Sequence, residues 1–599
     1  MNRNSLEQRS PMPLPPEKAI LLDAFLTSYQ PVSPHFLLRD VLPVLLQLDQ
    51  GESSDADNDR LFVGGAVAAL QKVPERITIV TSCALPEENM ASLPWLGRYV
   101  DWRMVGSDRD SIQHAKLWLC HWWRQDGEYL QITISSTNLT SDAFHGQLQA
   151  GWSICLPLAK AGRSGKPHVA LCDFMDALGA AADCSGATSR FIRLLQRCPE
   201  IPGSHFITSI PGRHMDRQQT GLLSGKTVAR KVGIRILTPS LGEWNDKEIS
   251  AWCAMLGVRP DKVELFWPHR SHPWVGAAES LDPGLWKMPV AARGALDAAG
   301  VRLLAVADPR VKPVLADGHP NDRRWCHAKF YGFPHGLMLG SHNWSKAAWG
   351  VPDGMPPKNF ELSVFVESQS LPLHGPFQRF TGDVALMERL PADEESHWLR
   401  WAQVTRNEST LTCAYRLRSG CTAIVEWQDG QSWYPFPPAV RQGKRRIATQ
   451  SLGDLQPEKV RLVYPDADGE QFVLPITDIR PGRPLPAGLG DDIVHLAEDI
   501  ELEQYGGPPA PACPPRSRGK KGKKRTASSA DYSLSWLLAA RRWRQVVDTW
   551  REEIEFQPAS VHLPLGLRLA AALERRAGND PGAAIAAEEL RLLVEEAQR

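Results

Sequence analysis

Two segments of the chain carry the same set of chemically reactive side chains in the same order. HAKLWLCHWWRQDGEYLQITISSTNLTSDAFHGQLQAGW occupies residues 114–152, and HAKFYGFPHGLMLGSHNWSKAAWG occupies residues 327–350. Each begins His-Ala-Lys, continues through an apolar stretch and reaches an Asn inside a Ser-rich turn. The matching residues are His114, Lys116 and Asn138 in the first copy and His327, Lys329 and Asn343 in the second. A lone His-x-Lys means little in a chain with 17 His, but two copies with the same continuation indicate an internal duplication.

These residue types suit attack on a phosphodiester. In an extended strand, residues i and i+2 point to the same face, so each His and its Lys would face one pocket. One neutral imidazole can attack phosphorus while the other protonates the leaving oxygen. The Lys and Asn side chains can hold the non-bridging oxygens as negative charge develops on them. Because two Lys supply the positive charge that Mg²⁺ would otherwise bring, we expect neither a metal nor a cofactor. The competing interpretation is that both copies are ordinary core strands with solvated His and Lys.

The chain between the motifs predicts an α/β fold. Helical periodicity appears at 185–198 and 246–256. Apolar, mostly β-branched runs that predict strands lie at 76–82, 130–136, 233–239, 262–268, 301–307, 336–341 and 360–366. This alternation favours helices covering a mixed sheet. The duplication implies two pseudo-symmetric α-β-α halves whose motifs meet at the interface between them.

At 599 residues the chain is long enough for three or four domains. Two strand–Asp-Gly–strand patterns, at 422–436 and 460–476, predict a small β domain. Trp536, Trp543 and Trp550 recur every seventh position, which favours a core stripe on one helix over base stacking. The predicted organisation is a flexible leader at 1–20, two halves at 21–200 and 201–400, a β domain at 401–485, a Pro/Gly/basic linker at 486–530 and a helical region at 531–599.

The composition is that of an ordinary globular protein. Lys+Arg 68 balances Asp+Glu 68, so there is no global basic charge, although a local basic stripe would suffice for a polyanionic partner. The 11 Cys show no CxxC pair and no zinc-type spacing. No apolar run has the length of a signal peptide or a membrane span. We therefore expect a soluble cytoplasmic protein without a membrane partner, associated with the nucleoid in a bacterium or nuclear in a eukaryote.

The paired motif resembles that of the phospholipase D superfamily. In its commonest members an Asp follows the Lys after four residues, whereas this chain has His121 and Pro334 at those places. The variant without the Asp is similar to tyrosyl-DNA phosphodiesterase. SIPGR at 209–213, NWSKAAWG at 343–350 and NFELSVFV at 359–366 add to the likeness, which covers roughly residues 20–385 and not the C-terminal 200 or so.

The resemblance implies two phospholipase D-like halves and a role for each motif residue. His114 would form a covalent phosphohistidine with the 3′ end of DNA, and His327 would act as general acid and then as base. The Lys and Asn residues of both motifs would hold the phosphoryl oxygens. Gln149 and Glu361 match a Gln and a Glu of the family, which fix the tautomers of the two His. A carboxylate raises imidazole basicity more than an amide does, so we expect Glu361 to serve His114 and Gln149 to serve His327.

Weaker signals surround these residues, and each has a structural alternative. Ser240 resembles a family residue that touches DNA phosphate. Glu361 lies in a strand-like run and could instead face solvent. Three other His near the motifs are interpreted as bystanders: His121, His145 and His342. Two basic stretches could follow a DNA strand or merely be solvated: Arg213, Arg217, Lys226, Arg230 and Lys231 in the first, and residues 516–525 in the second.

The function that this resemblance favours is DNA repair by hydrolysis of 3′-phosphotyrosyl or other 3′ adducts. The expected partners are single-stranded DNA 3′ ends, a tyrosyl or peptide leaving group, and proteins bound through the C-terminal region. One alternative is a related nuclease acting on unmodified DNA or RNA, for example in a defence system. Another is a DNA-binding scaffold without catalysis.

Overall fold

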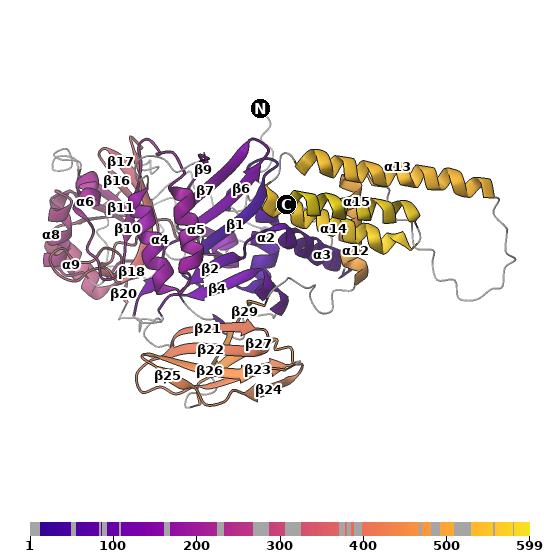
Figure 1. Ribbon diagram of the computed structural model, residues 1–599. Coiled ribbons are helices and arrows are strands. Elements are labelled where there is room, and N and C mark those ends of the chain that lie inside the picture. The colour runs from indigo at the N-terminus through magenta and orange to yellow at the C-terminus, as the bar shows by residue number, and fades with distance from the viewer. Residues whose placement is uncertain are drawn as a thin grey trace.

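The computed structural model places most of the chain as an α/β body with a β domain and a helical unit attached (Figure 1). The residues that the structure describes are 12–48, 56–82, 85–86, 93–106, 110–160, 168–224, 233–242, 244–267, 287–305, 325–369, 378–379, 385–387, 398–453, 455–465, 470–480, 491–507, 529–554, 558–578 and 580–598.

The first half is built on a six-stranded mixed sheet. Its strands lie in the spatial order β4 (Val100–Met104), β2 (Ile77–Thr81), β1 (Ile20–Thr27), β6 (Leu117–Arg124), β7 (Gly127–Ser135) and β9 (Gly151–Pro157). The pairings among β4, β2 and β1 are parallel, and those from β1 through β6 and β7 to β9 are antiparallel. β1 and β2 are buried along nearly their whole length, as expected for strands covered on both faces.

The second half repeats this strand order. Its sheet contains β14 (Arg302–Ala305), β12 (Val263–Trp267), β11 (Ile234–Leu237), β16 (Phe330–Phe333), β17 (Gly336–Gly340) and β18 (Asn359–Glu367). β14, β12 and β11 are parallel, and β16, β17 and β18 continue antiparallel, as their counterparts do in the first sheet. Two flanking strands extend this sheet: β10 (Ser204–Ser209) beside β18 and β19 (Gln378–Arg379) beside β14. The predicted α/β fold with two pseudo-symmetric halves is confirmed.

The two sheets share a hydrophobic core. In Figure 1, α4 (Val169–Ala181) and α5 (Ser185–Leu195) lie between the strands of the two halves. The core joins Phe25 and Leu117 of the first half, Phe174 of α4, and Leu362 and Val364 of the second half. The outer helices include α3 (Ala56–Lys72) on the first half and α8 (Asp246–Met255) and α9 (Val290–Ala299) on the second. Shorter helical segments are α1 (Pro34–Phe36), η1 (Leu37–Val41), α2 (Leu42–Leu46), η3 (Pro94–Arg98), η4 (Asp142–Gly146), α6 (Arg217–Ser224), η6 (Pro260–Lys262) and α10 (Lys346–Trp349).

The β domain consists of two five-stranded sheets around one core that contains Trp401 and Trp427. One sheet holds β25 (Val440–Gln442), β26 (Arg445–Ser451), β22 (Thr410–Leu417), β21 (Leu399–Asn407) and β29 (Ile476–Asp478). The other holds β24 (Ser432–Pro435), β23 (Ile424–Asp429), β27 (Lys459–Val463), β28 (Gln471–Leu474) and β3 (Leu85–Pro86). β3 comes from the first half of the chain, and a buried ion pair of 2.7 Å joins Arg98 to Asp478. The β domain is therefore attached to the first half by both strand pairing and charge.

The C-terminal helices form a separate core next to α3. They are α12 (Asp491–Gln504), α13 (Ser529–Ile554), α14 (Ala559–Ala577) and α15 (Pro581–Gln598). Trp543 and Trp550 are 2% and 1% exposed in this core, which confirms the core interpretation for these two residues. Arg568 of α14 donates to the carbonyl of Ala68 in α3 at 3.1 Å, which ties the unit to the first half.

Two boundary predictions need correction. Part of the predicted flexible leader is anchored: Met12 is 3% exposed and Ala19 4% exposed, and the Leu14 carbonyl accepts a hydrogen bond from Gln131. The predicted linker at 486–530 contains α12, whose Leu502 is fully buried in the C-terminal core. Composition hid both segments, because Pro-rich and Gly-rich neighbours surround a few anchoring apolar residues. The basic residues 516–525 lie outside the described part of the chain, as do residues 1–11.

No helix within the described residues combines the length and the apolar character that crossing a bilayer demands.

Candidate active site

Two short parallel strand pairings connect the halves and position the two motif histidines. β5 (Ile112–Gln113) pairs with the start of β18, so that Gln113 lies opposite Phe360. The next residues along these strands are His114 and Glu361. β8 (Gln147–Leu148) pairs with β15 (Trp325–Cys326).

The second pairing has the same arrangement, except that here the histidine comes from the second half and its partner from the first. Leu148 lies opposite Cys326, and the next residues are Gln149 and His327. Because parallel strands continue side by side, each histidine meets a partner from the other half. The contacts expected for both pairs, Glu361 with His114 and Gln149 with His327, are present.

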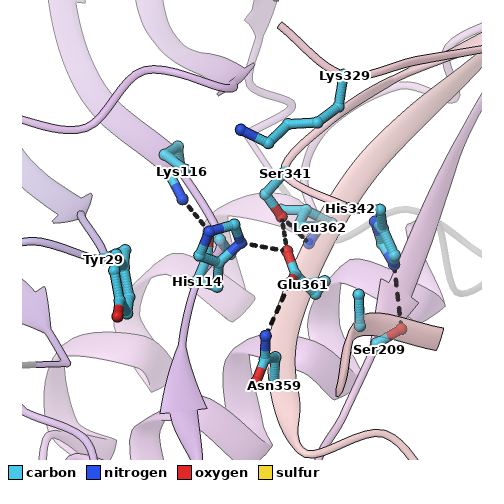
Figure 2. A network of polar contacts seen from close by, with 12 residues as sticks. Tyr29, His114, Lys116, Ser209, Lys329, Ser341, His342, Asn359, Glu361 and Leu362 are labelled. Atoms are coloured by element: carbon cyan, nitrogen blue, oxygen red, sulfur yellow. Dashed lines mark hydrogen bonds and ion pairs between the residues drawn. The ribbon is translucent and has the colours of Figure 1, made fainter. Parts of the chain in front are cut away.

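His114 is held by a buried carboxylate (Figure 2). Its Nδ1 lies 2.8 Å from Oε2 of Glu361, and its backbone N–H donates to the carbonyl of Phe360 at 3.0 Å. Glu361 is fully buried and receives two further donors, the hydroxyl of Ser341 at 2.5 Å and Nδ2 of Asn359 at 3.1 Å. A carboxylate only accepts, so Nδ1 of His114 carries the proton and Nε2 keeps a lone pair.

His327 has neutral acceptors instead. Its Nδ1 lies 3.0 Å from the carbonyl oxygen of Ser136 and 3.2 Å from Oε1 of Gln149. The hydroxyl of Ser136 donates to the same Gln149 oxygen at 2.7 Å. Two acceptors beside Nδ1 place its proton there, so that Nε2 of His327 is also the reactive nitrogen.

Both motif lysines are fully buried next to their histidines. Nζ of Lys116 donates to the carbonyl of His114 at 2.6 Å and lies 5.7 Å from the ring centre of Tyr29. Nζ of Lys329 donates to the carbonyl of His327 at 2.8 Å and lies 3.0 Å from Nε2 of the same residue. In Figure 2 the amino group of Lys329 points from the second half toward His114 and Lys116. Two ammonium groups beside one carboxylate leave a net positive site, which suits a phosphodiester anion.

The two asparagines occupy matching turns. The residue after each Asn is held by a hydroxyl: Leu139 N–H donates to Ser28 at 3.1 Å, and Trp344 N–H donates to Thr238 at 3.3 Å. Oδ1 of Asn138 accepts from the backbone N–H of Tyr29 at 3.2 Å, and its Nδ2 donates to Gln30. Oδ1 of Asn343 is buried and has no hydrogen-bond partner among the described residues.

Burial and charge separate the protonation states of these groups. Burial raises the pKa of Glu361, but His114 and Lys116 outweigh this and hold it at about 2, so the carboxylate is ionised. Burial lowers the pKa of His114 to about 4, against the opposing attraction of Glu361. Burial, Lys329 and Lys116 hold the pKa of His327 well below its usual range. Both imidazoles are therefore neutral at pH 7 in the ligand-free protein.

Sequence reasoning missed several residues of the site. Ser136 and Ser341 are the serines of the two Ser-x-Asn turns, and their presence in both copies was the available signal. Each accepts from a backbone N–H, of Ala150 and of Leu362 respectively, while donating to the partner of a histidine. Tyr29 carried no such signal; its ring packs edge-on against His114 with the centroids 5.1 Å apart (Figure 2).

The remaining candidates lie outside this cluster. Ser240 is exposed, two residues beyond Thr238, and its carbonyl accepts a hydrogen bond from Thr238 Oγ1 at 2.8 Å. His342 is buried between the hydroxyls of Ser209 and Ser363 rather than facing the motif lysines (Figure 2). The other two neighbouring histidines pair with carboxylates elsewhere: His121 with Glu128 and His145 with Asp40.

The basic stretch after SIPG is only partly described. Arg213 and Arg217 are exposed, and Lys226, Arg230 and Lys231 lie outside the described residues. Within the described part of the chain, no group of three or more His, Cys, Asp or Glu is placed to hold a metal ion.

One geometric expectation is wrong in detail. The motif His and Lys do not lie inside regular strands, because residues 114–116 and 327–329 form the irregular connections before β6 and β16. The short pairings of β5 and β8 set the direction of each histidine instead.

Comparison with known proteins gives matches at the level of structure. No protein-family model matches the chain, and no curated protein matches it. Yeast tyrosyl-DNA phosphodiesterase is similar with a TM-score of 0.39 and 16% identity, over 62% of this chain and 88% of the yeast chain. A mutant of the same yeast enzyme gives 0.39 and 15%, over 58% of this chain and 83% of that one. Polyphosphate kinase from Porphyromonas gingivalis gives 0.28 and 12%, over 59% of this chain and 44% of the kinase. These scores assign no activity, and the fold class rests on the strand order described above.

Proposed function

We propose that this protein is a metal-independent phosphodiesterase of the tyrosyl-DNA phosphodiesterase type, which removes tyrosyl, peptide or other adducts from DNA 3′ ends. The observation that supports this proposal most is the pairing of two histidines from two halves, one with a buried carboxylate and the other with an amide. Single-stranded DNA near its 3′ end is the proposed substrate strand, and DNA repair is the proposed setting.

In the first step, Nε2 of His114 attacks the phosphorus. The new P–N bond forms as the bond from phosphorus to the adduct oxygen breaks, and Nε2–H of protonated His327 delivers its proton to that oxygen. A phenolate with a pKa of about 10 is a good leaving group, so a tyrosyl adduct suits this step. Lys116, Lys329 and the two motif asparagines stabilise the phosphoryl oxygens. Glu361 stabilises the positive imidazole ring that results.

The low pKa of His327 in the free protein is compatible with its role as acid. Its proton is disfavoured by burial and by Lys329, Lys116 and His114. A bound phosphodiester places a negative charge among these groups, which raises the pKa of His327. We infer that His327 takes up a proton from solvent as the substrate binds, and that the first step consumes this proton.

In the second step, neutral His327 takes a proton from water, and the resulting hydroxide attacks phosphorus. The P–N bond to His114 breaks, the 3′-phosphate leaves, and His114 returns to its neutral state. The asymmetry of the partners fits this division of labour, since the carboxylate favours a charged His114 and the amide does not.

The test is cleavage of an oligonucleotide with a 3′-phosphotyrosyl group in the presence of EDTA. The wild type should release tyrosine and leave a 3′-phosphate, and His114→Ala should not. His205→Ala is the matched control, because the side chain of His205 is 42% exposed and pairs with Glu367 rather than with a motif residue. Internal cleavage of an unmodified strand would favour a nuclease, and tight binding of the adduct without turnover would favour a scaffold.

A further inference from the structure

A chain of side-chain amides runs from His327 to an exposed carboxylate. Gln149, whose oxygen faces His327, donates from its Nε2 to Oε1 of Gln147 at 2.7 Å. Gln147 donates in turn from its Nε2 to Oδ2 of Asp142 at 2.5 Å. Asp142 lies on η4, and a Cβ at Gly146 would come within 2.7 Å of its Oδ1, so a larger residue at 146 would require this carboxylate to shift.

The order of donors and acceptors in this chain is fixed from both ends. Asp142 only accepts, so the NH₂ of Gln147 faces it and the carbonyl of Gln147 faces Gln149. That carbonyl needs a donor, which the NH₂ of Gln149 supplies. At the other end, the hydroxyl of Ser136 donates to Gln149 Oε1 while also accepting from the N–H of Ala150. The oxygen of Gln149 is therefore held toward His327.

In the second half, the amide at the matching position presents a hydrogen-bond donor instead of an acceptor. Asn359 lies two residues before Glu361, as Gln147 lies two residues before Gln149. Its Nδ2 donates to Oε1 of Glu361 at 3.1 Å, so a donor is presented to a carboxylate there. Asn359 thus presents its NH₂ to the carboxylate of Glu361, whereas Gln147 presents its carbonyl oxygen to the NH₂ of Gln149.

We propose that Gln147, oriented by Asp142, is a positioning residue that admits only an amide at position 149 and so reserves the acid–base role for His327. This inference rests on the proposed function and deepens it, because it says why the two histidines keep different roles. An ionised Glu at 149 would place a carboxylate oxygen next to the carbonyl oxygen of Gln147, and these two acceptors would repel each other. If the Gln147 amide rotated by 180°, its carbonyl oxygen would face the carboxylate of Asp142 instead, and the same repulsion would arise there.

Asp142→Asn relieves this constraint without touching the site. An Asn at 142 can present either its oxygen or its NH₂, so Gln147 can turn its own NH₂ toward position 149. We expect Asp142→Asn alone to stay within about threefold of wild-type activity. Gln149→Glu alone should slow release of the 3′-phosphate about 100-fold, and adding Asp142→Asn to it should restore at least tenfold. Asp126→Asn, an exposed carboxylate that contacts Tyr129, is the matched control and should restore nothing.

A second readout does not depend on catalysis. Nitrogen-15 NMR of the Gln149 side-chain amide should show one ordered orientation in wild type and Asp142→Asn, and an amide that flips between two orientations in Gln147→Leu. If no variant cleaves any adduct but these spectra appear, the proposed function fails and the positioning role stands. If Gln149→Glu is equally slow with and without Asp142→Asn, or if Gln147→Leu leaves the Gln149 amide in its single orientation, the positioning role is wrong.

Discussion

Changing Glu361 to Gln tests whether the buried charge, rather than the shape of its side chain, makes His114 reactive. Gln keeps the size and an oxygen that can face His114, but the charge that stabilises the positive ring is lost. Outer partners of this kind are worth roughly 10–100-fold in activity, which is about 1.4–2.7 kcal/mol of transition-state free energy. Attraction to Glu361 is also the largest effect that opposes the lowering of the His114 pKa, so this pKa should fall further below about 4. We therefore expect the covalent step to slow by 10–100-fold.

The assay is single-turnover cleavage of the 3′-phosphotyrosyl oligonucleotide with enzyme in excess, which reports tyrosine release before hydrolysis of the intermediate. Glu367→Gln is the matched control: it makes the same chemical change at the exposed end of the same strand. A covalent step that stays within twofold of wild type in folded Glu361→Gln protein would refute the assigned role of the carboxylate.

Three further predictions concern the support of the site and the attachment of the β domain. Ser341→Ala removes the hydroxyl that donates to Glu361, so kcat should fall about tenfold with little change in KM, as steady-state kinetics would show; an unchanged kcat would make this hydroxyl dispensable. Burial lowers the pKa of His342 to about 4 from its usual 6.5. As the pH falls, His342 is therefore protonated in the unfolded chain before it is protonated in the folded protein. The free energy of unfolding should therefore be unaffected by His342 above pH 6.5 and should decrease as the pH falls toward 4. Urea unfolding should show that this decrease is about 3 kcal/mol smaller in His342→Gln than in wild type. Equal decreases in the two proteins would contradict this prediction. Asp478→Asn leaves Arg98 buried without its charge partner and should cost about 3 kcal/mol of unfolding free energy in the same assay, whereas a loss below 1 kcal/mol would show that the pair is not needed to hold the domain.

The sequence predicts the sheets and the motif residues because both have strong local signals. Each of the seven predicted strand-like runs overlaps a strand, and both helical runs begin where predicted, at 185 and 246. The duplication of His-x-Lys and Ser-x-Asn also survives as a duplication of strand order and direction. Periodicity and repetition are properties of a single segment, or of two segments compared, and the sequence displays them directly.

The elements that aim the histidines could not be found in this way. β5, β8 and β15 have two residues each, which is too short for any period. Their pairing depends on two halves meeting, and the contacts of Ser136 and Gln147 depend on which amide atom faces which neighbour. α12 was hidden by the Pro-rich and Gly-rich composition around it. Such features arise from tertiary contact and carry little signal along the chain.

The central claim is that His114 becomes covalently attached to the DNA 3′ end and that His327 releases it. His327→Ala should let the covalent species accumulate on a labelled 3′-phosphotyrosyl oligonucleotide, because the phenolate can leave unaided while water lacks its base. Peptide mapping by mass spectrometry should place the label on His114, and the His114→Ala, His327→Ala double variant should carry none. A label on any other residue, or a labelled double variant, would contradict the account.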